Sequence, residues 1–410
     1  MITVVSGDTI TVRGHQRNAS YATPAGLCSA LAAIIELALM TRDETSVILV
    51  PHNPLRNWPG NPGREELRNA LQLLGYVTQP TEGGWFVCTN GTGMDHRRII
   101  LGVREWGAGS QFLDHPDTLG GDAGVILATH LDAWVRRTHE HFVHTPGVAA
   151  LVSLRAFPRK KQPRWVLKDL ATADYWTPPV QIQDHRYRTN RRKGGDVYRW
   201  DMRSAYLAAM SSVELPYRQL QHTGMMPHSL TAGYFQIRIS KGRYGPTMLW
   251  PTPDRQGRIW LSASEYELFR RCSHPFDFLD SWTTQDGGRI LRTWAERWRD
   301  GITNQETPPK VAQVMKMGYA ELVGLMNVQK GTIYRPDWRH MIMGAVRASI
   351  TRRVLTVQAD HGLLPLKINV DAVYYAAKDA DDLGGHDKIS HSLGVGDRIG
   401  NMRFEGLEKL

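Results

Sequence analysis

A stretch rich in proline and basic residues, residues 151–195, sets the strongest limit on how this chain can fold. Its prolines, which prevent a long helix, are Pro158, Pro163, Pro178 and Pro179. Little hydrophobic periodicity accompanies them, which is typical of a linker. The chain has 410 residues, enough for two or three domains. We therefore expect this stretch to separate an N-terminal part from a C-terminal part.

The N-terminal part, residues 1–150, alternates strand-like and helical patterns. Short apolar runs at Ser46–Val50, Trp85–Cys88 and Arg98–Leu101 predict strands. An amphipathic helix is predicted over Glu65–Leu74, between the first two of them. This order predicts an α/β layer domain.

Beyond residue 195, two predicted strands each carry one aspartate. Val197–Asp201 ends on an acid, and Leu366–Tyr375 predicts a hairpin with Asp371 near its turn. The helices predicted around them are residues 204–210, 291–300, 309–326 and 340–359. If the two strands are neighbours in one sheet, the two carboxylates converge.

Paired carboxylates suit Mg²⁺, which keeps several waters and takes substrate phosphates as further ligands. Two such ions a few Å apart can hold the attacking and leaving oxygens of a phosphoryl transfer. For either aspartate taken singly, a turn or cap residue is the ordinary interpretation. The metal-binding interpretation of the pair is favoured only by the sequence motifs around the two aspartates.

Charge and cysteine content narrow the class of protein. The net charge of +10 is compatible with a polyanionic partner such as nucleic acid. Three widely separated cysteines argue against a disulfide framework or a zinc ribbon. No apolar run is long enough to span a bilayer, and the first residues lack a signal-peptide pattern, so we expect a cytoplasmic protein without a membrane partner.

Three segments, in order, resemble the motifs of family B DNA polymerases. Asp201–Leu207 is similar to D-x-x-S-L-Y-P, and Lys316–Gly324 is similar to K-x-x-x-N-S-x-Y-G. Asn369–Ala372 stands where the family has D-T-D-S. Flanking segments extend the resemblance over roughly residues 185–405, most closely to the protein-primed branch of bacteriophages and linear plasmids.

The resemblance implies an α/β (α+β) fold with a degenerate RNase H-like, exonuclease-like domain at residues 1–150. It implies a basic linker and template-contact loop at 151–195, a palm of antiparallel sheet and helices at 196–288 and 331–410, and short helical fingers at 289–330. Little chain follows the last palm strand, so we expect the thumb to be absent or vestigial. Between Gly324 and Gly344 there is also no room for the insertion that gives protein-primed enzymes their processivity.

The resemblance also implies roles for single residues. Asp201 and Asp371 would be catalytic and would bind two Mg²⁺ or Mn²⁺ ions, with the backbone carbonyl of Met202 as a third contact. The residues implied for nucleotide binding are Ser204, Tyr206 and Lys316, with Tyr206 excluding a 2′-hydroxyl. A buried core tyrosine and a solvated helix lysine are the ordinary alternatives for the last two.

DNA contacts are implied mainly in a basic cluster ahead of the first acid. The implied nucleic-acid-binding residues are Tyr187, Arg188, Arg191, Arg192, Lys193 and Arg403. A solvated charged surface is the alternative for this cluster. The expected partners are template and primer DNA, dNTPs, and a terminal protein or other replication protein that would supply the missing grip.

Several departures from the family pattern leave two hypotheses open. Asn369 replaces the first acid of D-T-D-S, and Ala320–Glu321 replaces the Asn-Ser pair. The first N-terminal strand carries no D-x-E pair. The first hypothesis is template-directed nucleotidyl transfer, as a DNA polymerase or a primase-like enzyme, with low processivity and no proofreading. The alternative is a catalytically inactive nucleic-acid-binding scaffold, which a salt bridge from Arg203 to the acid pair would favour.

Overall fold

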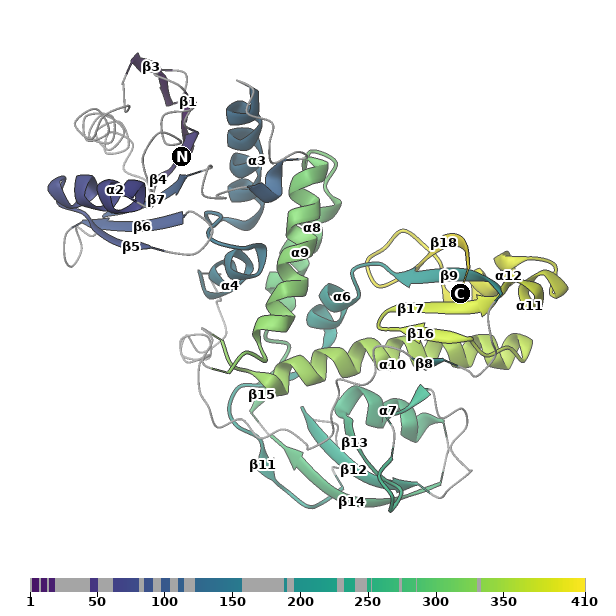
Figure 1. Cartoon of the computed structure of the whole chain (residues 1–410). Helices are drawn as coiled ribbons and strands as arrows, with labels where there is room; N and C mark the ends of the chain where they lie inside the picture. Colours follow the sequence, from purple (N-terminus) through teal and green to yellow (C-terminus); the bar gives the residue numbers. More distant parts are fainter. Residues whose placement is uncertain are drawn as a thin grey trace. The chain divides into compact units, whose positions relative to one another are not determined.

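Figure 1 shows the computed structural model, which describes residues 2–6, 9–12, 15–18, 45–50, 62–80, 85–90, 97–103, 110–113, 122–156, 188–189, 195–226, 232–239, 249–251, 253–272, 275–284, 286–329 and 333–409. The chain divides into two compact units. The first contains residues 1–157 and 300–322, and the second contains residues 158–299 and 323–410. No helix in the described ranges is long and apolar enough to cross a membrane.

The first unit is built on a seven-stranded sheet of order β3-β2-β1-β4-β7-β6-β5. Its strands are β1 (Ile2–Ser6), β2 (Thr9–Val12), β3 (His15–Asn18), β4 (Thr45–Val50), β5 (Val77–Pro80), β6 (Trp85–Asn90) and β7 (Arg97–Val103). The central strands β1, β4 and β7 are parallel, and the outer ones are antiparallel. The three strands predicted from apolar runs are thus present, as β4, β6 and β7.

The helices of the first unit include α2 (Pro62–Leu73), α3 (Asp122–Thr138) and α4 (Pro146–Ala156), with a short 3₁₀ helix at Ser110–Phe112. A buried aromatic cluster joins α3 to the segments on either side of it. Phe112, Trp134 and Phe142 meet edge to face at centroid distances of 4.8–6.0 Å. Such contacts supplement the burial of apolar area.

The second unit contains two antiparallel sheets and a small β-ribbon. The first sheet has the order β18-β9-β17-β16-β8, the second has the order β11-β14-β12-β13, and β10 pairs with β15. Their strands are β8 (Arg188–Thr189), β9 (Asp196–Met202), β10 (Leu215–Pro216), β11 (Gln221–His222), β12 (Gly233–Ile239), β13 (Arg258–Ser262), β14 (Phe276–Thr283), β15 (Gly287–Gly288), β16 (Lys367–Asn369), β17 (Ala372–Ala376) and β18 (Met402–Lys409).

Five helices lie wholly within the second unit among the described residues. They are α6 (Ala205–Ser212), α7 (Ala263–Arg271), α10 (Pro336–His361), α11 (Ala377–Asp382) and α12 (His386–Leu393). The chain passes between the units inside α8 (Arg292–Thr303) and inside α9 (Pro309–Leu325). This mixture of helices and antiparallel sheet confirms the expected fold class, and the predicted helices at residues 291–300, 309–326 and 340–359 are present as α8, α9 and part of α10.

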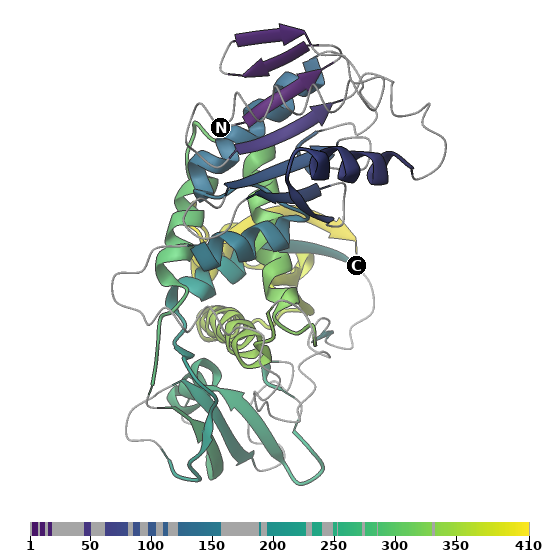
Figure 2. The same ribbon diagram turned by 90° about the vertical axis from the view of Figure 1, so that its left-hand side faces the viewer.

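The long helix α10 runs between the two sheets of the second unit, and Figure 2 looks nearly along its axis. Its N-terminus is fixed by a buried ion pair between Arg335 and Asp337, with two contacts of 2.9 and 2.7 Å. The Pro216 carbonyl on β10 accepts from Arg335 at 2.8 Å and from the Trp338 indole at 2.9 Å. The Tyr234 hydroxyl on β12 donates to the Asp337 carbonyl. This network ties α10 to two strands.

Further along α10, Gly344 allows a close approach to the start of α7. Ser262 and Glu265 form a capping box there, and Arg347 donates to the Glu265 carboxylate at 2.7 Å. A Cβ on Gly344 would lie 2.1 Å from the Ser262 Oγ and 2.8 Å from a Glu265 oxygen. A larger residue would therefore displace the helix or break the cap.

We expect Gly344→Ala to lower the free energy of unfolding by about 1–3 kcal/mol, because the site is already filled. The matched control is Gly324→Ala, since a Cβ at this α9 glycine would meet nothing within 4 Å. That change should raise stability by about 0.5–1 kcal/mol, because alanine suits a helix better than glycine. Urea unfolding of both variants measures the difference. Equal effects would contradict the close approach of α10 to α7.

Candidate active site

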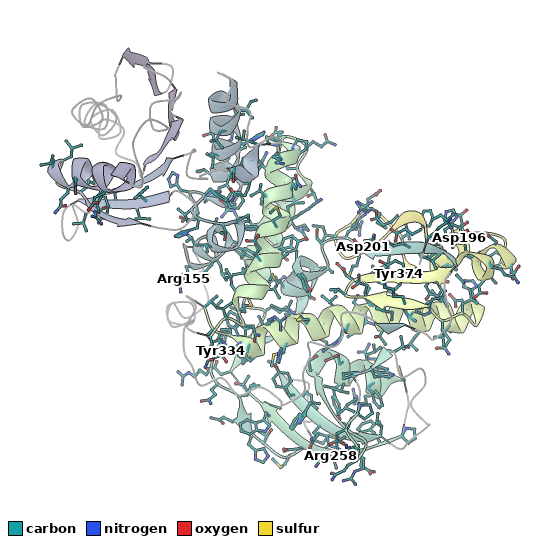
Figure 3. The ribbon with its side chains drawn as sticks, viewed as in Figure 1. Arg155, Asp196, Asp201, Arg258, Tyr334 and Tyr374 are labelled. Atoms are coloured by element: carbon teal, nitrogen blue, oxygen red, sulfur yellow. The ribbon has the colours of Figure 1, made fainter. Side chains whose placement is uncertain are left out.

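The two predicted aspartates lie side by side at one end of the five-stranded sheet. Asp201 is near the end of β9 and is opposite Ala372, the first residue of β17. Asp371 occupies the two-residue turn that joins β16 to β17, and its carbonyl accepts the Met202 N–H at 3.0 Å. Figure 3 labels Asp201 on β9 and Tyr374 on the neighbouring strand. The fold thus brings together two acids that are 170 positions apart in the sequence (371 − 201).

Strand register places a defined set of side chains on the same face of the sheet as Asp201. Asn369, Ala372, Asp201 and Arg403 are successive partners across β16, β17, β9 and β18. Directly opposed residues share a face, because side chains alternate along each strand. The small Ala372 is therefore the only side chain of this row between Asn369 and Asp201.

A second row of side chains lies two residues further along each strand and carries positive charge. It consists of Lys367, Tyr374 and Arg199 on adjacent strands. The Lys367 Nζ lies 5.0 Å from the centre of the Tyr374 ring, and the Arg199 guanidinium lies 5.9 Å from it. Cations over an aromatic face are attracted by its quadrupole. Two cations, Lys367 and Arg199, thus lie against the Tyr374 ring in the row next to that of Asp201.

Burial raises the pKa of both acids, and the charge of Asp201 also raises that of Asp371. The pKa of Asp371 is raised from 3.8 to about 6, first by burial and then by the negative charge of Asp201. The pKa of Asp201 is raised by burial and by Glu405, and lowered by Arg199 and Arg403. An opposite charge close to such acids favours their ionised forms. The pair therefore favours binding of a cation.

The backbone is strained in two turns near the acids, one after β9 and one before β17. Val370, next to Asp371, has φ 54°, and Ser204, three residues after Asp201, has φ 48°. Positive φ is rare for residues other than glycine, and especially so for a β-branched residue such as valine. Beside these residues, the Asp371 carbonyl accepts the Met202 N–H and the Ser204 carbonyl accepts the Ala208 N–H, each at 3.0 Å. Such strain is found most often at functional sites.

The arginines around the pair are engaged elsewhere. Arg199 donates to Glu408 at 3.0 Å, Arg403 pairs with Glu405, and Arg203 pairs with Asp397 at 3.4 Å. Within the described residues, no basic side chain forms an ion pair with Asp201 or Asp371. The Arg203 salt bridge that would have favoured an inactive scaffold is thus directed to Asp397.

The residues fit a magnesium-type ion whose remaining ligands come from water and substrate. In the part of the chain that the structure describes, no group of three or more His, Cys, Asp or Glu side chains gathers around one point. Mg²⁺ is commonly held by one or two carboxylates together with waters and substrate phosphates. Asp201 and Asp371, with oxygen donors only, match that requirement.

The other predicted site residues are placed as follows. Met202 ends β9, Ser204 precedes α6, and Tyr206 is half-buried in the first turn of α6. Lys316 is exposed on α9, in the first unit. Arg188 lies in β8, of which only the backbone is described. Residues outside the described ranges are Tyr187, Arg191, Arg192 and Lys193.

Two functions of side chains were not foreseen from the sequence. Arg199 acts on both acids, and its spacing of two from Asp201 on a strand was the available signal. Glu321, one of the departures from the family pattern, accepts the Gly147 N–H at the start of α4 at 2.8 Å. A carboxylate at a helix N-terminus is stabilising, so Glu321 has a structural role within the first unit.

We expect Asp201→Asn to stabilise the metal-free protein at pH 8 by about 1 kcal/mol, because the like charge beside Asp371 is removed. A raised carboxyl pKa favours folding at low pH, and this contribution is lost as the pH rises through about 6. The gain should therefore vanish below pH 4. Denaturant unfolding in EDTA at both pH values measures it. A loss of stability at pH 8 would contradict the repulsion.

Comparisons with known proteins add the class of fold. No protein-family model matches the chain, and no curated protein matches it either. Solved structures do match: the fold resembles that of a DNA polymerase. These structures are phi29 DNA polymerase with primer–template DNA (TM-score 0.50) and the same enzyme with primer–template DNA and incoming nucleotides (TM-score 0.52). Each has 12% sequence identity over 99% of this chain and 84% of the other.

Proposed function

We propose that the protein is a template-directed nucleotidyltransferase, a DNA polymerase or a primase-like enzyme making short products, that uses Asp201 and Asp371. The observation that carries the proposal is the pairing of β9 with β17, which sets the two acids side by side. The resemblance of the fold to a DNA polymerase supports it. The absence of an ion pair on either acid, among the described residues, also supports it, because the pair is open to a cation.

In this proposal, Asp201 and Asp371 hold two Mg²⁺ or Mn²⁺ ions, with the Met202 carbonyl as a further ligand. When bound, the ions lower the pKa of the primer 3′-hydroxyl and offset the charge that develops on the phosphates. The new bond joins the 3′-oxygen to the α-phosphorus. The bond between the α-phosphorus and the α–β bridging oxygen breaks, and pyrophosphate leaves with that electron pair. The hydroxyl proton passes to water.

Other residues position the substrates in the same proposal. Ser204 and Tyr206 bind the incoming nucleotide, with Tyr206 packing under the sugar and disfavouring a 2′-hydroxyl. Lys316 supplies a cation for the triphosphate. Arg403, opposite Asp201 on β18, contacts a primer phosphate. Catalysis by such a site consists mainly of positioning and charge stabilisation.

We also propose low processivity and no proofreading. Only residues 326–335 connect α9 to α10, which leaves no room for an additional domain that would encircle DNA. After the predicted strand at Ser46–Val50, His52–Asn53 resembles the second exonuclease motif of family B polymerases, and it lies outside the described residues. The lack of a D-x-E pair on the first strand supports loss of proofreading. A partner such as a terminal protein would supply further grip on DNA.

Nucleotide incorporation tests the proposal. The full chain is incubated with each dNTP or NTP and Mg²⁺ or Mn²⁺, on primed and unprimed templates. We expect template-dependent addition of dNTPs, short products, and weak use of NTPs. Products independent of the template sequence would contradict template direction. A protein that binds primer–template but incorporates nothing with any primer or metal would support the scaffold instead.

A further inference from the structure

Arg203 is held firmly by its backbone next to the acid pair. It lies two residues after Asp201, and the ladder between β9 and β18 continues to it, because its N–H donates to the Asn401 carbonyl at 2.9 Å. Its own carbonyl accepts the Gly400 N–H at 2.8 Å. These two backbone hydrogen bonds fix Arg203 directly after β9, at the end of the sheet that carries Asp201.

The Arg203 guanidinium is poorly satisfied where it lies. Its ion pair with Asp397 is long, at 3.4 Å, and the Asp397 side chain is fully exposed. Exposed pairs of this kind contribute little. The Arg203 Nε is buried and has no hydrogen-bond partner in the described part of the chain. Buried donors are nearly always paired in proteins, so the guanidinium has an unmet donor in its present position.

The Arg199 Nε is likewise buried without a hydrogen-bond partner among the described residues, but the neighbouring arginines have better-placed acidic partners. Arg199 has a shorter ion pair with Glu408, and Arg403 is paired with Glu405, both from β18. The Glu405 carboxylate is also largely shielded from solvent, whereas Asp397 is not. Of these three arginines, Arg203 is therefore the one whose partner is most easily exchanged.

We propose that the Arg203 guanidinium is a phosphate-binding group of the active site, which exchanges Asp397 for phosphate oxygens of the incoming nucleoside triphosphate. Arginine presents several N–H donors in a fixed plane that matches phosphate oxygens. A cation beside the metal-binding acids also offsets charge on the leaving phosphates. This inference rests on the proposed function. It assigns a ligand to a side chain that the resemblance leaves without one.

Binding measurements on the whole 410-residue chain test this role. Arg203→Gln removes the charge, Arg203→Lys keeps it without the planar donors, and Asp397→Asn removes only the present partner. Fluorescence anisotropy reports binding of a labelled dATP with Ca²⁺, of inorganic tripolyphosphate as competitor, and of labelled primer–template DNA. We expect Arg203→Gln to weaken dATP and tripolyphosphate binding roughly 10- to 100-fold, with primer–template affinity changed less than 2-fold. Arg203→Lys should recover part of the loss.

Each outcome decides the matter. Unchanged dATP affinity in Arg203→Gln overturns the inference, even if the parent polymerises normally. Weakened primer–template binding with intact dATP binding also overturns it, and would assign the phosphate to the DNA backbone. If Asp397→Asn weakens dATP as much as Arg203→Gln, the ion pair is structural and the inference is wrong. Weakened triphosphate binding in a protein that never incorporates nucleotides supports the inference while contradicting the proposed function.

Discussion

Replacement of Asp371 by alanine is expected to lower nucleotide incorporation by roughly 10³-fold or more, which corresponds to about 4 kcal/mol of transition-state stabilisation. The acid lies in the tight turn beside Asp201, so its loss removes half of the carboxylate pair. Folding should be preserved, because burial and the charge of Asp201 raise the Asp371 pKa and disfavour its ionised form. Single-nucleotide incorporation rates and circular dichroism measure both effects.

The matched control is Asp196→Ala, at the opposite end of β9, where the aspartate is exposed (Figure 3). This change should alter incorporation less than 2-fold, because Asp196 is remote from the acid-bearing end of the strand. If Asp371→Ala incorporated nucleotides as fast as the parent protein, the proposed chemistry would be wrong. Equal losses in both variants would indicate a general effect on the sheet.

The largest expected effect on stability is that of Asp337→Ala. Arg335 and Asp337 are both fully buried and make a two-contact ion pair at the start of α10. Removal of one partner leaves a buried charge uncompensated, and typically costs about 3–5 kcal/mol. The Arg335 side chain would also hold Pro216 less rigidly, since it donates to that carbonyl. Chemical unfolding of the purified variant measures the loss.

An exposed pair provides the comparison. Arg292 and Glu296 form a salt bridge one turn apart on α8, with both side chains partly exposed. Arg292→Ala should change stability by less than about 0.5 kcal/mol. The double variant Arg335→Met with Asp337→Leu should recover much of the loss, because a buried pair can be replaced by apolar groups. A loss below 1 kcal/mol in Asp337→Ala would contradict the burial of this pair.

The part of the site that follows from local patterns was predictable. A short apolar run that ends on Asp201 predicts one strand, and the apolar run around Asp371 predicts a hairpin. The tight turn at Asp371 follows from that hairpin. The ordered motifs then predict that the two strands are neighbours, which the register confirms. Helix α9 was predicted from residue 309, and it begins at Pro309, since proline is tolerated at a helix start.

The rest depends on contacts between distant residues. Arg335 donates to the Pro216 carbonyl, which lies 119 positions away in the sequence. The sequence around Arg335 shows only a charged residue before a helix, so it does not predict that this side chain is fully buried. Likewise, Glu321 reaches Gly147 across 174 positions. Composition cannot show such pairings, because a side chain is buried only after several elements have packed. The position of Arg199 relative to both acids also required the strand register.

The division of the chain has a practical consequence for work with fragments. Residues 300–322 belong to the same compact unit as residues 1–157, although residues 158–299 intervene. A fragment that ends at the proline-rich stretch would lack all of α9, and with it the carboxylate that caps α4. We therefore expect residues 1–157 expressed alone to be aggregation-prone and sensitive to protease. Supplying residues 290–330 as a separate peptide should restore protection, as in complementation between split halves of an enzyme.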